Sequence, residues 1–302
     1  MGLIPKITRQ RAKDVSSKED AMESARTESP QSVGQEAPNV CSGILENFSL
    51  AGAAVQGPGH LRAGTPCDDR FAWHSSLGRV CAVVADGAGS AKLGRVGAES
   101  VSSILVRNVL ETTNETPLTI EGVRAAVRAG VFCARRALAT SHPQARLSDF
   151  HATVVGAVWD SDTCILFHIG DGVGAVIAND RSSLAEAATW EDALVSEPEN
   201  GDSADQTYFF TMDPIRLRLK QVQNPLAVVL MTDGAASLCY THQSAKLEGG
   251  FFSPIASYLA RTNDLEKLAS QLPGVMRSDQ ANITSDDDKC IIIAIRGNSR
   301  AT

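Results

Sequence analysis

The chain has 302 residues, of which 43% are hydrophobic and 21% charged, as expected of a globular protein with an ample core. Its net charge of −7, without a visible basic stripe, argues against nucleic acid as a partner and suits carboxylates that bind a cation. No apolar segment approaches the roughly 20 residues of a membrane-spanning helix, and no secretory signal is visible. The seven cysteines are never spaced as C-x-x-C, which favours a reducing compartment. We therefore predict a cytoplasmic protein that binds neither nucleic acid nor a membrane.

The N-terminal part differs in composition from the rest of the chain. Residues 1–42 are rich in Ser, Glu, Lys, Arg, Gln and Pro and show little periodicity. Such a segment buries too little apolar surface to offset the entropy of ordering. We predict a disordered polar tail over residues 1–42 and one folded domain over residues 43–302.

Apolar patterns place the elements of the folded domain. The turn residues of 57–60 and 64–66 are expected to flank a short strand, and the acidic pair Asp68-Asp69 leads into another strand. The run Val80–Ala85 has no polar break and predicts a buried strand. Helical periodicity follows over about 91–109, 123–142, 252–262 and 264–272, and further strands are expected at about 151–159, 163–169, 173–178, 226–232 and 290–296. Strands interrupted by helix pairs, without regular βαβ alternation, indicate an α+β fold with packed sheets.

Aspartate recurs where predicted strands end or begin. Asp86, Asp171 and Asp233 each follow an apolar run and precede glycine, and residues 286–288 are three aspartates directly before the last strand. A single Asp-Gly pair is a common turn. Four strand-edge acids instead predict a site assembled from distant segments. Carboxylates gathered without a cation would repel one another, and Mg²⁺ and Mn²⁺ prefer oxygen ligands.

These segments, in this order, resemble the motifs of the metal-dependent protein phosphatase 2C family, and the resemblance covers about residues 50–297. The motifs read Gly-Thr-Pro-Cys-Asp68-Asp69, Val-Ala-Asp86-Gly87, His-Ile-Gly170-Asp171-Gly172, Met-Thr-Asp233-Gly234 and Asp287-Asp288-Lys289. The loop Pro198-Glu199-Asn200-Gly201 that leads to Thr207-Tyr208-Phe209 is similar to a bacterial subgroup of that family.

The resemblance implies a fold and a metal centre. The fold is a β-sandwich of two antiparallel sheets flanked by pairs of helices, with residues 43–302 as the catalytic domain. The implied metal ligands are Asp69 (through water), Asp86, the Gly87 carbonyl, Asp171, Asp233 and Asp287. Asp86 bridges two Mn²⁺ or Mg²⁺ ions, and Asp171 serves a third, weaker site. A metal pair lowers the pKa of a bridging water, so no protein side chain is needed as the nucleophile.

The chain departs from the family pattern at three positions. Ala88 stands where eukaryotic members carry histidine, so that general acid is absent. Gly64 stands where the phosphate-binding arginine is expected; Arg62 or His60 substitutes for it, or both are surface turn residues. Ser237 replaces an acid that often serves the third metal.

The resemblance implies a serine/threonine protein phosphatase, a signalling hydrolase whose nucleophile is the metal-bridging water. Its partners would be phosphorylated proteins and, by family analogy, a Ser/Thr kinase acting on the same substrates. A catalytically degenerate phosphatase fold that serves as a regulatory binding module is the alternative, and the three departures keep it open.

Overall fold

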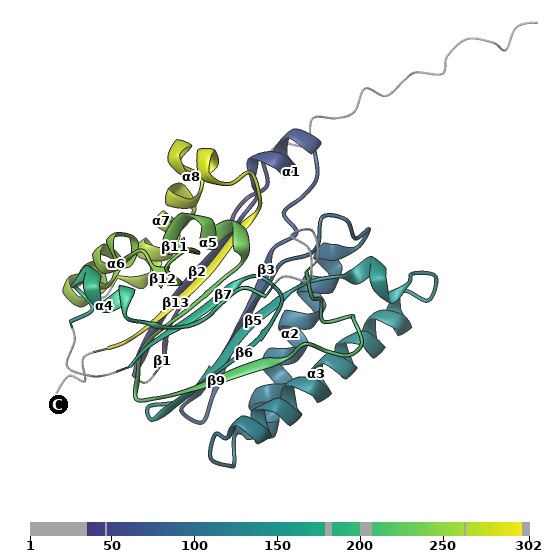
Figure 1. Ribbon diagram of the computed structural model, residues 1–302, viewed down its shortest axis with the longest axis horizontal. Coiled ribbons are helices and arrows are strands. Elements are labelled where there is room, and N and C mark those ends of the chain that lie inside the picture. The colour runs from purple at the N-terminus through teal and green to yellow at the C-terminus, as the bar shows by residue number, and fades with distance from the viewer. Residues whose placement is uncertain (1–34, 46, 179–182, 200–206, 263, 298–302) are drawn as a thin grey trace, which may run out of the picture. The chain divides into compact units, whose positions relative to one another are not determined.

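The computed structural model describes residues 35–45, 47–178, 183–199, 207–262 and 264–297, all within the compact unit of residues 33–302. Two sheets dominate it (Figure 1), and all of their strand pairs are antiparallel. The six-stranded sheet has the order β1 (Asn39–Leu45), β2 (Phe48–Val55), β13 (Lys289–Arg296), β10 (Pro225–Met231), β7 (Val173–Ala178) and β8 (Leu194–Ser196). The five-stranded sheet has the order β3 (Arg70–Ser76), β4 (Arg79–Ala85), β5 (Val154–Trp159), β6 (Thr163–Ile169) and β9 (Arg218–Gln223).

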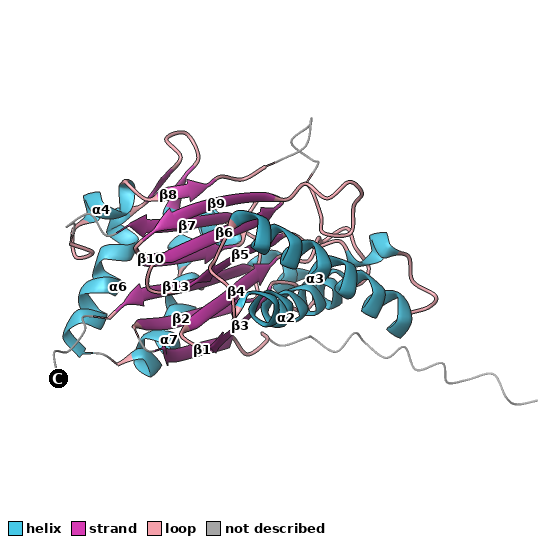
Figure 2. Cartoon of the chain, turned by 90° about the horizontal axis from the view of Figure 1, so that it is seen from below, coloured by secondary structure: helices cyan, strands magenta, loops and turns pink. Residues whose placement is uncertain are grey.

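Helices cover the outer face of each sheet (Figure 2). The five-stranded sheet carries α2 (Gly94–Thr113) and α3 (Ile120–Ser141). The six-stranded sheet carries α4 (Ala187–Glu191), α6 (Gly249–Thr262) and α7 (Leu265–Met276). Shorter elements complete the fold: α1 (Pro58–Ala63), the 3₁₀ turn Leu147–Phe150, α5 (Asp233–Cys239), β11 (Tyr240–Thr241), β12 (Lys246–Leu247) and α8 (Asp279–Thr284). Among the described residues, no helix combines the length and apolar character that crossing a bilayer requires.

Strand β4 shows why a central strand consists mainly of apolar residues. Val80, Ala82 and Val84 pack between the two sheets. The alternate side chains Cys81 and Val83 pack against the helices. Because side chains alternate between the faces of a strand and both faces are covered, apolar residues are favoured on both faces of β4. The fold is thus the predicted α+β sandwich of two antiparallel sheets flanked by helix pairs.

The segment before Asp68 differs from the prediction. Instead of a short strand between turns, residues 58–63 form α1. Pro58 suits the start of a helix, because a backbone N–H at that position would have no partner within the helix. Gly64 ends the helix with φ 68°, a conformation that glycine tolerates best. The glycines and prolines that indicate turns in the sequence therefore begin and end a six-residue helix.

The boundary predicted at residue 42 is also wrong. Strand β1 begins at Asn39 and pairs with β2, with Asn39 opposite Ala54. Its exposed Val40 and Ile44 and its polar flanks hide the strand from a composition-based reading. Residues 1–34 lie outside the described residues, so their disorder stays a prediction.

Candidate metal centre and active site

The predicted acids meet because of how the strands run. Strand β5 is antiparallel to both β4 and β6, so β4 and β6 end at the same edge of their sheet. Asp86 directly follows β4, and Asp171 lies two residues after β6. In the other sheet Asp233 follows β10 by two residues. One carboxylate oxygen from each of these three residues lies within 4.8 Å of the others. The structure therefore brings together Asp86, Asp171 and Asp233, which we call the acidic triad.

The glycine after two of these acids permits close packing of the backbone. A Cβ on Gly87 would lie 2.4 Å from the carbonyl carbon of Gly94, at the start of α2. A Cβ on Gly234 would lie 1.9 Å from the carbonyl oxygen of Asp288. Neither backbone neighbour is able to move aside as a flexible side chain would. The Asp-Gly pairs thus serve packing at the sheet edge, which lets chain segments approach the acids closely.

The acidic triad holds negative charge that the described residues leave uncompensated. Burial, followed by repulsion from Asp69 and Asp233, raises the pKa of Asp86 well above its usual value. Burial, then repulsion from Asp171 and Asp287, raises the pKa of Asp233 to about 6. Burial also raises the pKa of Asp171. An electrostatic conflict of this kind at one site is typical of a functional centre.

Two further predicted ligands lie around the triad. Asp69 is buried directly before β3 and accepts a hydrogen bond of 2.7 Å from the Thr232 hydroxyl. Asp287 is exposed, and one of its carboxylate oxygens accepts from the Asp288 backbone N–H at 2.8 Å. It lines an open pocket of about 320 Å³ together with Asp171 and Asp233. Of these two acids, Asp69 is thus buried within the fold and Asp287 is exposed at the pocket.

The Gly-Asp motif around Asp171 is anchored by residues for which the sequence indicates no role. Thr207 donates to one Asp171 oxygen at 2.5 Å. Arg218 donates to the Gly170 carbonyl at 3.2 Å, contacts the buried His168 ring at 3.1 Å and pairs with Glu199 at 2.8 Å. Thr207 belongs to the segment that resembles the bacterial subgroup. Arg218, at an edge strand, carries no sequence signal that would reveal it.

The two candidate phosphate-binding residues lie on α1 and contact the segment before β13. His60 Nδ1 lies 2.9 Å from a carboxylate oxygen of Asp288 and 3.0 Å from the Pro66 carbonyl. Arg62 forms a two-contact pair with Asp286 at 2.5 and 3.4 Å. The Arg62 and Asp286 side chains are both 64% exposed, whereas that of Asp288 is 2% exposed. His60 is therefore held in the structure, while Arg62 makes a surface ion pair.

Asp288 also receives backbone hydrogen bonds. Gly57 N–H donates to one oxygen at 2.7 Å and Asp68 N–H to the other at 2.5 Å. The two acids on either side of Asp287 thus differ: Asp288 joins α1, the first acidic motif and β13, whereas Asp286 is exposed. At the other departures, Ser237 donates to the Gly234 carbonyl at 2.7 Å, and Ala88 offers no proton.

The donor set of the triad fits a hard divalent cation. All three ligands are carboxylates, which Mg²⁺ and Mn²⁺ prefer. Asp171 Oδ1 is buried and has no hydrogen-bond partner among the described residues, so an acceptor is free for an ion. A cation would also relieve the repulsion that raises the three pKa values. The site thus has the chemistry of an Mg²⁺ or Mn²⁺ centre.

No curated protein matches the sequence. Among solved structures, the serine/threonine phosphatase Stp1 from Staphylococcus aureus has a TM-score of 0.55 at 14% identity, covering 85% of this chain and 96% of that one. The catalytic domain of the serine/threonine phosphatase PstP in complex with two manganese ions has a TM-score of 0.52 at 14% identity, covering 83% and 99%. RsbX in complex with magnesium has a TM-score of 0.51 at 12% identity, covering 86% and 100%.

These structural likenesses establish a shared fold. The sequence model of protein phosphatase 2C matches residues 56–277, a segment that contains four of the five acidic motifs. Because this match spans well over half of the chain, the protein belongs to the protein phosphatase 2C family.

Proposed function

We propose that the protein is a Mn²⁺- or Mg²⁺-dependent phosphatase that hydrolyses phosphoserine and phosphothreonine in proteins. The observation that carries the proposal is the acidic triad, whose carboxylate oxygens lie within 4.8 Å of one another. The family and the phosphatases of similar fold support the same reaction class. A kinase that phosphorylates the same substrates is the proposed counterpart.

Each residue of the site has a proposed role. Asp86, Asp233, Asp287 and the Gly87 carbonyl hold a pair of divalent ions, with Asp69 in support through water, and Asp171 holds a third. When bound, such ions activate water and neutralise phosphate charge. Thr232 fixes the Asp69 carboxylate, and Thr207 fixes one oxygen of Asp171 while leaving the other free.

Arg62 is the better placed of the two proposed phosphate-binding residues. Its pair with Asp286 is exposed, and exposed ion pairs contribute little stability, so the guanidinium is released at small cost. A guanidinium also binds two phosphate oxygens at once. His60 faces the buried Asp288 and would leave that carboxylate partly unpaired if it turned towards substrate.

A regulatory binding module without turnover is the second candidate. Two observations favour it: Arg62 and His60 are both paired with aspartates, and Ala88 supplies no general acid. Such a module would bind a phosphorylated partner or Mn²⁺ but release no phosphate.

One assay separates the two. The purified full chain is incubated with an aryl phosphate and with a phosphoserine peptide, in excess chelator and then in a Mn²⁺ series. Phosphate release that requires Mn²⁺ supports the phosphatase. If Mn²⁺ binds, as measured by calorimetry, and phosphate release does not exceed that of Asp86→Asn, the binding module is correct.

A further inference from the structure

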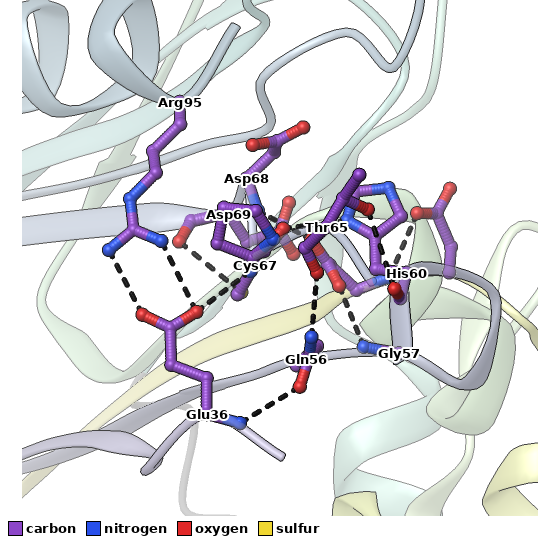
Figure 3. Close-up of polar contacts among 12 residues, drawn as sticks. Glu36, Gln56, Gly57, His60, Thr65, Cys67, Asp68, Asp69 and Arg95 are labelled. Atoms are coloured by element: carbon purple, nitrogen blue, oxygen red, sulfur yellow. Dashed lines mark hydrogen bonds and ion pairs between the residues drawn. The ribbon is translucent and has the colours of Figure 1, made fainter. Parts of the chain in front are cut away.

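Glu36, three residues before β1, contacts the loop that carries the first acidic motif (Figure 3). One carboxylate oxygen of Glu36 accepts from the Cys67 backbone N–H at 2.8 Å. The two oxygens accept from the two terminal nitrogens of Arg95 at 2.9 and 3.2 Å. Cys67 directly precedes Asp68 and Asp69, so the contact lies two residues from a proposed metal-site residue.

Arg95 connects this contact to the second acidic motif. It lies in the first turn of α2, and its backbone N would be 2.7 Å from a Cβ placed on Gly87. The backbone of Gly87 is therefore tightly packed against the first turn of α2, and α2 cannot shift there without moving Gly87. Through Arg95 and Cys67, the Glu36 carboxylate joins the segments that carry Asp86 and Asp69.

The backbone of Glu36 is held as firmly as its side chain. Its N–H donates to the side-chain oxygen of Gln56 at 2.9 Å, and its carbonyl accepts from Arg277 at 2.7 Å. Gln56 is 4% exposed and uses its amide nitrogen to donate to the Thr65 carbonyl at 2.6 Å. The loop 65–69 is thus fixed at Thr65 by Gln56, at Cys67 by Glu36 and at Asp68 by Asp288.

The geometry differs from that of an ordinary surface ion pair. Exposed pairs of long side chains contribute little because both side chains lose rotamer freedom. Here the Glu36 side chain is about 31% exposed and accepts a hydrogen bond from the backbone N–H of the buried Cys67. It also forms a bidentate pair with Arg95, as arginine and carboxylate groups often do. Burial opposes the charged form, yet Cys67 N–H and Arg95 outweigh it and lower the pKa of Glu36.

We infer that Glu36 is a positioning residue for the metal centre, which aligns the Asp69 loop with the Asp86-Gly87 turn from outside the site. The inference rests on the proposed function, because it presumes that these acids bind Mn²⁺. Groups that orient metal ligands directly change metal affinity by about 10–100-fold. Glu36 acts one contact further away, so we expect a smaller effect.

The test is Mn²⁺ titration calorimetry on the full chain, compared with thermal unfolding in chelator. Glu36→Gln keeps the size and one acceptor but loses the charge, and we expect its Mn²⁺ dissociation constant to rise about three- to tenfold. Arg95→Gln should have a similar effect, and the double variant should be no worse than either single one. Asp160→Asn is the matched control, since it weakens another partly buried ion pair, to Arg79 at 3.3 Å, at the far end of β4 from Asp86.

The outcomes are distinguishable. Wild-type Mn²⁺ affinity in folded Glu36→Gln, or a change no larger than that of Asp160→Asn, would overturn the inference alone. If Glu36→Gln does not fold, Arg95→Gln with the native glutamate tests the same link. Failure of the unchanged protein to bind Mn²⁺ would refute the proposed function and this inference with it. Mn²⁺ binding that weakens in Glu36→Gln, in a protein without phosphatase activity, would refute the proposed function only.

Discussion

Two groups of aspartates lie at the same edge of the sandwich and differ in the partners that surround them. Asp86, Asp171 and Asp233 face one another, and their pKa values are raised by burial and by neighbouring acids. Asp286 and Asp288 face partners on and around α1, namely a guanidinium, an imidazole and backbone N–H groups. In the first group the fold keeps carboxylates close to one another. In the second group it supplies each carboxylate with a cationic side chain or with hydrogen-bond donors.

The difference separates a binding site from a structural contact. A protein gains nothing in stability from carboxylates that repel one another, so their proximity indicates a cationic ligand. A carboxylate whose acceptors are all used by the chain indicates a role in holding segments together. Substitution of a triad aspartate should therefore impair function but stabilise the metal-free fold. Substitution of Asp288 should destabilise the fold.

The largest effect is expected from neutralising the triad. Asp86→Asn and Asp233→Asn each remove a proposed direct ligand. Because loss of an outer-shell partner already costs about 10–100-fold, each should lower kcat/KM more than about 100-fold at saturating Mn²⁺. The measurement is aryl phosphate hydrolysis, with Asp160→Asn, at the far end of β4 from Asp86, as a control of the same chemical change. Activity within a few-fold of wild type in either folded triad variant would show that the centre lies elsewhere.

The next effect concerns stability at the second group. Asp288→Asn places an amide donor against the Gly57 N–H or the Asp68 N–H, and leaves one of them without an acceptor. We expect a loss of about 2 kcal/mol in the free energy of unfolding, measured with urea in chelator. Asp286→Asn, two residues away and exposed, should cause no measurable change. Equal effects of the two substitutions would contradict the distinction between a structural carboxylate and a surface one.

The two groups also differ in how far the sequence predicts them. Each triad aspartate follows an apolar run, such as Val80–Ala85, and precedes a glycine or a Gly-containing turn, so local pattern and chain order suffice. The sheet edge then brings the acids together because antiparallel strands fix where their ends lie. The same reasoning places the central strands correctly, since continuous apolar runs report burial of both faces.

Contacts between polar residues far apart in the chain are not visible in this way. Glu36 meets Cys67, 31 residues away, and Arg95, 59 residues away. Glu36 lies in a segment whose composition indicates a disordered tail, and no periodicity marks it. Arg218 and Asp288 likewise act through backbone groups, which are the same for every residue type. Such contacts depend on the packed fold, so only a structure reveals them.

A smaller effect is expected from pH in the metal-free protein. The folded-state pKa of Asp233 is about 6, against an ordinary value of 3.8, because burial and neighbouring acids oppose its charge. A raised carboxyl pKa means that the folded state holds the proton more tightly. Its stabilising contribution is therefore present below pH 3.8 and is lost as the pH rises through about 6.

Asp233→Asn does not titrate, and its amide oxygen is still able to accept the Gly234 N–H bond of 2.6 Å. In chelator at pH 7.5 the variant should exceed wild type by about 1–2 kcal/mol, or about 2–6 °C in Tm, and this gain should shrink as the pH falls through about 6 and vanish below pH 3.8. Excess Mn²⁺ should reverse the order at pH 7.5, because binding stabilises only the intact site. A difference in Tm that does not vary with pH would contradict the uncompensated charge.

The smallest effect is expected at Arg62. Its pair with Asp286 is exposed at both ends, so water and salt compete with it and the guanidinium exchanges between partners. If it binds substrate phosphate, Arg62→Gln should raise KM about fivefold with little change in kcat, because uniform binding is lost. Asp286→Asn should act in the opposite direction and lower KM about twofold, since it frees Arg62. Both effects should shrink in high salt, whereas thermal stability should stay constant. An unchanged KM in both variants would mean that Arg62 belongs with Asp288 and His60 among the structural contacts, and that the phosphate is bound by another group.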